Sequence, residues 1–422
     1  MMKIRKRSIL ITMLICVIIL GHLVSILPRT LMGVAPTLQR LLIPVFTIIL
    51  FFWRMGSPSK FYSNSFNYFL CVIVVWIIWG ILGLFISPYS GLKDGAKEIL
   101  CIMLGFGNVL CIYECVRSKK DIDTIFAILR WIVIGLLFMA CLEAITDWHL
   151  ASSSLREISM KRISVAGISL YCSTTIFYNV NDFCAFLAIL LPLFFKEKKG
   201  YKIIDIMVLF CGIFLMWLDD ANICIFAIFF SFIVYNMVVV GHFEKKFLAI
   251  ILVVSFLILI NKVLSSQLSI FSLEETVTMQ ITNAKMGMGS LYSRLMVYME
   301  SVKATIKTYG LGLGPAGFIP YFQNTPHKGG LVNPHNYWLE ILSQYGILIF
   351  VLYVWLCVRE FKNMLEIYKR NRGKEAAIMI AVYSSFVFAS IAPSSFLEYS
   401  YQWVVLSLCI TIEKIYQGQI LD

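Results

Sequence analysis

The sequence predicts an all-α fold: a polytopic integral membrane protein of about twelve transmembrane helices, with one large extracytoplasmic loop that contains an amphipathic helix. Three observations support this prediction. Hydrophobic residues make up 59% of the chain, charged residues only 14%, and the mean hydropathy is +0.83. Apolar runs long enough to cross a bilayer recur along the chain. Basic residues lie in short clusters between these runs, as they do in membrane proteins.

The predicted spans follow the apolar runs. They cover residues 9–27, 37–53, 67–87, 97–115, 122–146, 180–195, 202–218, 221–240, 247–265, 336–358, 375–392 and 396–414. The first run follows the basic cluster at residues 3–7 and is long enough to span the membrane rather than act as a cleaved signal peptide. We find no internal repeat in the sequence, so a single membrane domain is expected over residues 1–422.

The basic residues also predict the orientation. If the N-terminus is cytoplasmic, every second connection is cytoplasmic too, and these segments carry 22 of the 36 basic residues. The positive-inside rule then places both termini in the cytoplasm. Two extracytoplasmic segments are large, residues 147–179 and residues 266–335. The net charge of +12 is thus explained by topology, and we exclude nucleic acid as a partner. The twelve cysteines show no metal-binding spacing, which predicts no metal site.

Residues 291–309 of the large loop predict an amphipathic helix. Apolar residues recur at helical spacing on one face, at Leu291, Leu295, Tyr298, Val302, Ile306 and Tyr309. The other face carries Arg294, Glu300, Lys303 and Lys307. Such a helix can lie on the membrane surface or cover a cavity, and Gly310 is expected to end it.

A glycine-rich motif follows at residues 310–317, with Gly310, Gly312, Gly314 and Gly317. It resembles a phosphate-binding loop, but no strand precedes it, which argues against a dinucleotide site. Two interpretations stay open. The segment is either a turn that leads from the surface helix to the next span, or a cradle of backbone amides for phosphate or sugar oxygens. In the second case Gly312 and Gly314 are substrate-binding residues.

Asn333-Pro334-His335-Asn336 predicts the start of the tenth span. Asn333 suits the N-cap and Pro334 suits the first helical position, so His335 is expected in the first turn. The helix dipole would favour the neutral imidazole there. Neutral imidazole accepts a proton near neutral pH, which makes His335 a candidate general base. The alternative is a hydrogen-bonded histidine with no chemical role.

Three arginines of the extracytoplasmic segments are candidate phosphate ligands. Arg294 lies on the amphipathic helix, and Arg156 and Arg162 lie in the smaller segment. Each could simply contact lipid headgroups. Together with a histidine on the same side of the membrane, they suggest a site for a diphosphate, because guanidinium groups bind phosphate oxygens with two parallel donors.

Asp219 and Asp220 separate the seventh and eighth predicted spans. A tight exposed turn is the favoured interpretation, and the alternative is a functional acidic site near the membrane surface. Asn181 and Asp182 are expected to cap the sixth span.

Three stretches resemble the O-antigen polymerase and O-antigen ligase superfamily of bacterial envelope polysaccharide assembly, which includes capsule and teichuronic acid polymerases. The first stretch runs from Lys161 to Gly167 and continues at residues 178–187. The second contains Ser293-Arg294-Leu295 and the glycine motif, and the third opens at His335-Asn336 and reaches Gly346. With the span count and the large loop, the resemblance covers about residues 155–360.

The resemblance implies a metal-independent glycosyltransferase on the outer face of the cell membrane, with no cofactor. Its donor would be an oligosaccharide on a polyprenyl (undecaprenyl) diphosphate, and its acceptor a second glycan. In the family an outer-loop histidine is thought to activate the acceptor hydroxyl, which maps to His335. The arginines thought to hold the diphosphate map to Arg294 and Arg162. Asn336 belongs to the same motif and is a candidate substrate ligand. Membrane lipids, a flippase and a chain-length regulator are candidate partners.

The chain departs from the family between the seventh and eighth spans. Many members carry Ser-Arg-Gly there, and this chain carries Asp219-Asp220-Ala221-Asn222. A basic diphosphate ligand is therefore replaced by acids. Either Arg156 or Arg162 substitutes for it or the donor differs, and acceptor sugar hydroxyls are candidate ligands of Asp219 and Asp220.

The sequence thus favours a polysaccharide polymerase that joins lipid-linked repeat units. Three alternatives stay open. One is a ligase of the same fold, which transfers a finished glycan to a lipid or protein. Another is a flippase or other transporter of lipid-linked glycans, although transporters usually show internal repeats and charges buried within spans. The third is a scaffold without activity.

Overall fold

The computed structural model describes residues 2–21, 37–55, 63–150, 161–165, 168–195, 202–240, 289–325, 332–393, 397 and 399–421. Its helices are α1 (Met2–Leu20), α2 (Leu38–Met55), α3 (Asn64–Ile86), α4 (Leu92–Cys115), α5 (Lys119–Thr146), α6 (Val180–Leu190), α7 (Ile203–Leu218), α8 (Asn222–Tyr235), α11 (Gly289–Lys307), α12 (Phe318–Gln323), α13 (Tyr337–Asn371), α14 (Lys374–Ala389) and α15 (Tyr401–Leu421). Short helical turns extend α6 (η2, Leu191–Phe194) and α8 (η3, Asn236–Val240). Two strands, β1 (Lys161–Val165) and β2 (Ile168–Tyr171), form a hairpin.

The fold is a helical membrane protein, as the sequence predicts. Five helices are long and apolar enough to cross a membrane: α3, α4, α5, the α8–η3 segment Asn222–Val239, and α13. Shorter apolar helices lie at Arg7–Leu20, Leu38–Leu50, Val180–Phe194 and Ile203–Leu218. The predicted ninth span, residues 247–265, lies outside the described residues. The count of twelve spans stays a prediction.

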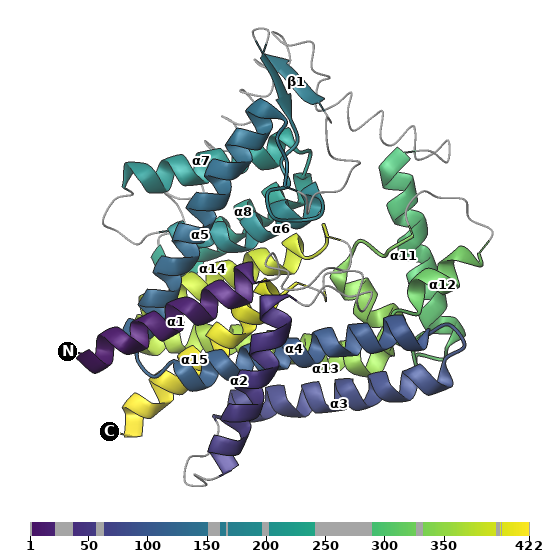
Figure 1. The fold of residues 1–422 in the computed structure, drawn as a ribbon, viewed down its shortest axis with the longest axis horizontal. Coiled ribbons are helices and arrows are strands. Elements are labelled where there is room, and N and C mark those ends of the chain that lie inside the picture. The colour runs from purple at the N-terminus through teal and green to yellow at the C-terminus, as the bar shows by residue number, and fades with distance from the viewer. Residues whose placement is uncertain are drawn as a thin grey trace.

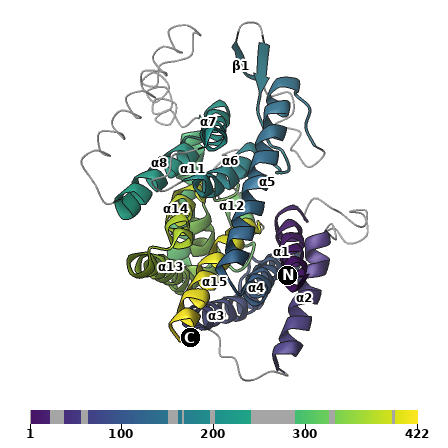
Figure 2. The same ribbon diagram turned by 90° about the vertical axis from the view of Figure 1, so that its left-hand side faces the viewer.

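The helices form a bundle with two distinct ends (Figures 1 and 2). Both chain termini lie at one end, and α11 and α12 lie at the other. Arg7, Lys374 and Lys414 gather at the end with the termini. They contact the α4–α5 connection and the start of α5, at Asp121 (2.6 Å from Arg7), Asp123 (2.8 Å from Lys374) and the carbonyl of Val116 (2.7 Å from Lys414). The sequence assigns these basic residues to one side of the membrane.

The buried core lies along α6 and α14. Every residue of α6 from Asp182 to Leu190 is buried, and α14 is buried from Glu375 to Phe386. Helices α8 and α15 pack on α14, and the Ser385 hydroxyl of α14 donates a hydrogen bond to the Ala188 carbonyl of α6 at 2.5 Å. This packing fixes the positions of the helix ends that carry polar side chains.

The segment 147–179, to which the sequence analysis assigns no secondary structure, includes two strands. It contains the antiparallel hairpin β1–β2, in which Ile163 faces Leu170 and Val165 faces Ile168. The β-branched and apolar residues on both sides of the Ala166-Gly167 dipeptide favour such pairing. Arg156 lies outside the described residues, so its predicted role stays a prediction.

Candidate functional site

The segment before α13 packs against α11. The Tyr298 hydroxyl of α11 donates a hydrogen bond to the backbone carbonyl of His335, at 3.3 Å. On the other side, the Tyr337 backbone amide donates to the Ser390 carbonyl at the end of α14, at 3.1 Å. His335 is therefore held between the amphipathic helix and the helical core.

The predicted helix start at Asn333 is wrong. Asn336 is the N-cap of α13, and its side-chain oxygen accepts hydrogen bonds from the amides of Trp338 (3.0 Å) and Leu339 (3.3 Å). His335 precedes the cap and has a left-handed backbone with φ of 45°. Asn336 is the better N-cap because its side chain accepts hydrogen bonds from two amides of the first turn that have no partners within the helix.

His335 is neutral at pH 7 for a different reason from the predicted one. Burial and, to a smaller extent, the positive charge of Arg294 together lower its pKa from the ordinary value of 6.5 to about 4. Its Nδ1 atom is buried and has no hydrogen-bond partner among the described residues. A buried nitrogen without a hydrogen-bond partner costs free energy, so a ligand or a water molecule is expected to bind this atom.

Arg294 lies on α11 and is half-buried. Its charge acts on the His335 imidazole and on the Tyr298 hydroxyl, one turn along α11. Burial raises the pKa of Tyr298, while Arg294 and a hydrogen bond from Asn336 oppose this rise. Three residues from two segments, Arg294, Tyr298 and Asn336, are therefore gathered around His335. The sequence analysis selects His335, Asn336 and Arg294 as candidates but not Tyr298.

A second polar group lies at the start of α6. Asp182 is 1% exposed and accepts a hydrogen bond from the Tyr399 hydroxyl. Asp219, at the end of α7, is 4% exposed and accepts from the Ser173 amide at 3.2 Å. The half-buried Arg162 on β1 has a buried Nε atom without a hydrogen-bond partner in the described part of the chain. The charges of all three act on the Cys184 thiol in α6.

These observations correct two predictions. Asp219 is buried rather than part of an exposed turn, and only Asp220 is exposed, where it accepts from the Asn222 side chain at 2.9 Å. The cap of α6 is Asn179, whose side chain accepts from the Asp182 amide, rather than Asn181 or Asp182. Adjacent aspartates therefore face opposite environments, which residue type alone does not reveal.

Cys224, at the start of α8, connects the two polar groups. The charge of Arg294 acts on its thiol, and Cys224 in turn lies within electrostatic range of Cys184 and of Tyr401. The rings of Tyr399 and Tyr401 stack, with centroids 5.6 Å apart. The two arginines, two aspartates and His335 therefore belong to one end of the bundle, beside this tyrosine pair, of which Tyr399 is half-buried and Tyr401 is buried.

A buried ionic group holds the turn that carries Ser173. The Glu143 carboxylate of α5 accepts hydrogen bonds from the amides of Thr174 and Thr175, both at 2.8 Å. His149 Nδ1 lies 3.7 Å from the same carboxylate, and Thr175 has a left-handed φ of 51°. Glu143 therefore positions the backbone that binds Asp219.

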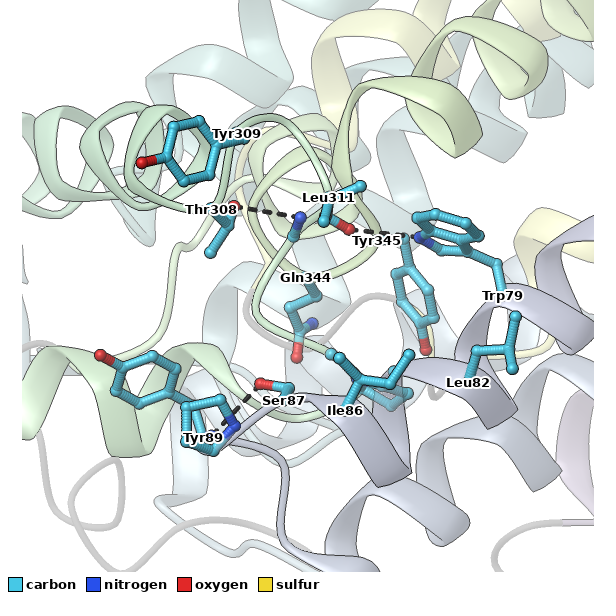
Figure 3. Close-up of a pocket in the computed structure, with 15 residues that line it drawn as sticks. Trp79, Leu82, Ile86, Ser87, Tyr89, Thr308, Tyr309, Leu311, Gln344 and Tyr345 are labelled. Atoms are coloured by element: carbon cyan, nitrogen blue, oxygen red, sulfur yellow. Dashed lines mark hydrogen bonds between the residues drawn. The ribbon is translucent and has the colours of Figure 1, made fainter.

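The glycine motif is a docked turn, and its amides are already bonded. The Gly312 amide donates to the Thr308 hydroxyl at 3.1 Å (Figure 3). The Gly314 amide donates to the Gln344 carbonyl at 2.9 Å. A Cβ atom at Gly312 would lie 2.5 Å from that same carbonyl. Because both amides are already bonded, the contacts favour the turn interpretation over an amide cradle at Gly312 and Gly314.

This turn sits in a break of α13. Gly346 has φ of 78° and ψ of −175°, and a Cβ there would lie 2.2 Å from the Gly310 carbonyl. The cavity of about 280 Å³ between the turn and α3 is lined by Trp79, whose indole nitrogen donates to the Leu311 carbonyl at 3.2 Å (Figure 3). The break lets the loop approach the α13 backbone and fixes the path from α11 to α13.

A polar cavity of about 170 Å³ adjoins the site. Its walls include Asn333 and Pro334, which immediately precede His335, and Glu98 and Glu340. The Glu98 carboxylate also accepts from the Tyr345 hydroxyl at 2.6 Å and the Ala316 amide at 3.2 Å. Carboxylate and amide groups of this kind suit sugar hydroxyls.

The sequence analysis missed Tyr298, Asp182 and Tyr399 as members of the site. Tyr298 was assigned to an apolar stripe, although its hydroxyl is a polar end. Tyr399 lies within the last predicted span, 396–414, and just before α15, in the run Glu398-Tyr399-Ser400-Tyr401-Gln402. The polar and aromatic composition of this run was the available signal.

One comparison with known proteins is informative. The chain is 24% identical, over 361 residues, to the teichuronic acid biosynthesis protein TuaE of Bacillus subtilis (strain 168), and the match covers 81% of this chain and 70% of that protein. No protein-family model matches the chain.

Proposed function

We propose that this protein is a glycosyltransferase of cell-envelope polysaccharide synthesis that polymerises oligosaccharide units carried on a polyprenyl diphosphate. The observation that carries the proposal is that Arg294 acts on a neutral His335 whose buried Nδ1 atom has no hydrogen-bond partner among the described residues. The similarity to a teichuronic acid biosynthesis protein supports the same class of pathway.

His335 acts as the general base in this proposal. The acceptor hydroxyl attacks the anomeric carbon of the donor sugar, and the bond from that carbon to the diphosphate oxygen breaks. The imidazole takes the hydroxyl proton, and the diphosphate leaves with its electron pair. A positioned base of this kind contributes about 10²- to 10⁴-fold to a rate.

Arg294 binds the diphosphate, and Arg162 is a second ligand. Guanidinium groups stabilise the charge that grows on a leaving diphosphate, and they do so best where water is excluded. Asp182 and Asp219 supply acceptors for sugar hydroxyls, and the half-buried Tyr399 supplies a ring surface for a sugar ring. With both termini in the cytoplasm, the site lies on the extracytoplasmic face of the membrane.

The test uses the purified protein in nanodiscs with lipid-linked repeat units extracted from a strain that lacks it. A ladder of products with one-repeat steps, absent with His335→Ala, supports a polymerase. Transfer of glycan only to an added lipid or protein acceptor identifies a ligase. Movement of lipid-linked glycan across vesicles without any transfer overturns the enzymatic proposal and favours a flippase.

A further inference from the structure

An apolar groove of about 730 Å³ lies between α8, α13 and α14. Its walls include Phe230 and Val234 from α8, Val354 and Val358 from α13, and Phe388 from α14. Val358 is 46% exposed, so the groove is open at the surface of the bundle. Two of its three helices, α8 with η3 and α13, are long and apolar enough to cross a membrane, so the groove opens toward lipid.

The lining is suited to a hydrocarbon chain. None of the described residues that line the groove carries a charge, and aromatic and branched aliphatic side chains dominate. The Ser384 hydroxyl in the lining already donates to the Ile380 carbonyl, at 2.7 Å. Burial of apolar surface is therefore the main source of binding free energy for a ligand in this groove.

The groove adjoins the candidate site and runs far along the bundle. Its lining includes Trp338, two residues after Asn336, and reaches along α13 from Phe350 to Leu365. The part of α13 from Phe350 to Leu365 is roughly 22 Å long at about 1.5 Å per residue. The hydrocarbon core of a bilayer is about 30 Å thick, so the groove covers much of its depth.

The helices that form the groove also carry the polar site at their ends. The charge of Arg294 acts on Cys224 at the start of α8 and on His335 just before α13. A ligand whose charged end is held by Arg294 therefore has an apolar path directly below it, between these two helices.

We propose that this groove binds the polyisoprenoid tail of the carrier lipid whose diphosphate is held beside Arg294 and His335. The inference rests on the proposed function for the identity of that lipid. An acyl chain of a bulk phospholipid also fits an apolar groove. The difference is that a carrier lipid is anchored at its diphosphate, so each buried isoprene unit adds to the affinity of the whole molecule.

The experiment compares two diphosphates that differ in tail length. Binding of geranyl diphosphate and of a long-chain polyprenyl diphosphate is measured on the protein in nanodiscs of phosphatidylglycerol and phosphatidylethanolamine. Val354→Trp and Val358→Trp fill the groove. Val74→Trp is the matched control, because Val74 is a 43% exposed valine on α3 that does not line the groove. Thermal unfolding checks that each variant folds.

Wild-type protein and Val74→Trp should bind the long-chain diphosphate at least about tenfold more tightly than geranyl diphosphate, given the apolar surface that the additional tail buries. The two groove variants should lose most of this difference and still bind geranyl diphosphate within about twofold of wild type. Full retention of the tail preference in both groove variants overturns the inference. Loss of the preference when the phospholipid-to-protein ratio is raised also overturns it, and identifies bulk acyl chains as the occupant.

Failure of the proposed function gives a different pattern. A polyprenol without the diphosphate tests the groove alone, and its binding should be lost in Val354→Trp. Suppose that the polyprenol binds wild-type protein but not Val354→Trp, and that neither diphosphate binds either protein. The groove inference then holds, and the assignment of the diphosphate to Arg294 fails.

Discussion

The Tyr298 hydroxyl and the backbone carbonyl of His335 are joined by a 3.3 Å hydrogen bond between α11 and the segment before α13. This contact connects the amphipathic helix of the predicted large loop to the candidate base. Because His335 has a left-handed backbone, its position depends on such contacts rather than on a regular helix.

Replacing Tyr298 by Phe should lower kcat by about 2- to 10-fold, since a typical hydrogen bond contributes about 0.5–1.5 kcal/mol. Tyr298 acts here as a positioning residue. Tyr309→Phe is the matched control, because Tyr309 follows the end of α11 and is 94% exposed. Turnover of lipid-linked repeat units, with its pH profile, is the measurement. Equal effects of the two substitutions would contradict the role of Tyr298.

The pH dependence of kcat/KM should follow the lowered pKa of His335. A general base works when neutral, so activity should persist as the pH falls through the ordinary value of 6.5 and decline only near the pKa of about 4. Bound diphosphate offsets the charge of Arg294, which raises the pKa of His335. The acid limb of kcat should therefore lie at a higher pH than the limb of kcat/KM.

Arg294→Gln provides the control for this prediction. Removing the positive charge should raise the pKa of His335 and move the acid limb of kcat/KM to higher pH. If the limb stays where it is in wild type, the group that titrates is not His335 beside Arg294.

Arg294→Lys should lower kcat/KM by about 10- to 100-fold. A lysine keeps the charge but loses the two parallel donors, and hydrogen bonds to charged groups are worth about 1.5–3 kcal/mol. The measurement is turnover at varied donor concentration. Activity equal to wild type would leave Arg294 as a contact for lipid headgroups only.

Asp219→Asn should reduce activity far more than Asp220→Asn. The first change alters a buried carboxylate that accepts from the Ser173 amide, whereas the Asp220 carboxylate is exposed and bonds only locally to Asn222 among the contacts described. The pair differs by one position and carries the same chemical change. Turnover and thermal unfolding of both variants separate an effect on the site from an effect on folding.

Gly346→Ala should destabilise the fold by at least about 2–3 kcal/mol, because only glycine readily adopts the backbone at this position. A Cβ atom would also overlap the Gly310 carbonyl at 2.2 Å. Gly135→Ala is the control, since a Cβ there meets nothing within 4 Å and alanine favours the α5 helix by about 0.5–1 kcal/mol. Thermal unfolding in detergent should show opposite shifts. If Gly346→Ala left the unfolding temperature unchanged, the break in α13 would accommodate a Cβ atom without loss of stability.

The sequence by itself determined the class of fold and the ends of many helices. Apolar runs and basic clusters were sufficient, because lipid-exposed backbone must form helices and the period of the apolar pattern marks them. His335, Asn336 and Arg294 could be selected because polar groups are concentrated in few segments of an apolar chain. Their neighbours could not be selected on that basis: Tyr298 counts as apolar in a helical pattern, and Asp182 resembles a capping residue.

Only the tertiary structure decided which adjacent residues face the core. Asp219 is buried and Asp220 exposed because the turn after α7 passes beside Ser173, a contact across 46 positions of sequence. The glycine motif became a docked turn because α13 breaks at Gly346, which no local pattern predicts. Helix starts and spans depend on short-range hydrogen bonds and hydropathy, which the sequence encodes directly. The pairing of Arg294 with His335 depends on how distant helices pack, and that packing is a property of the whole fold.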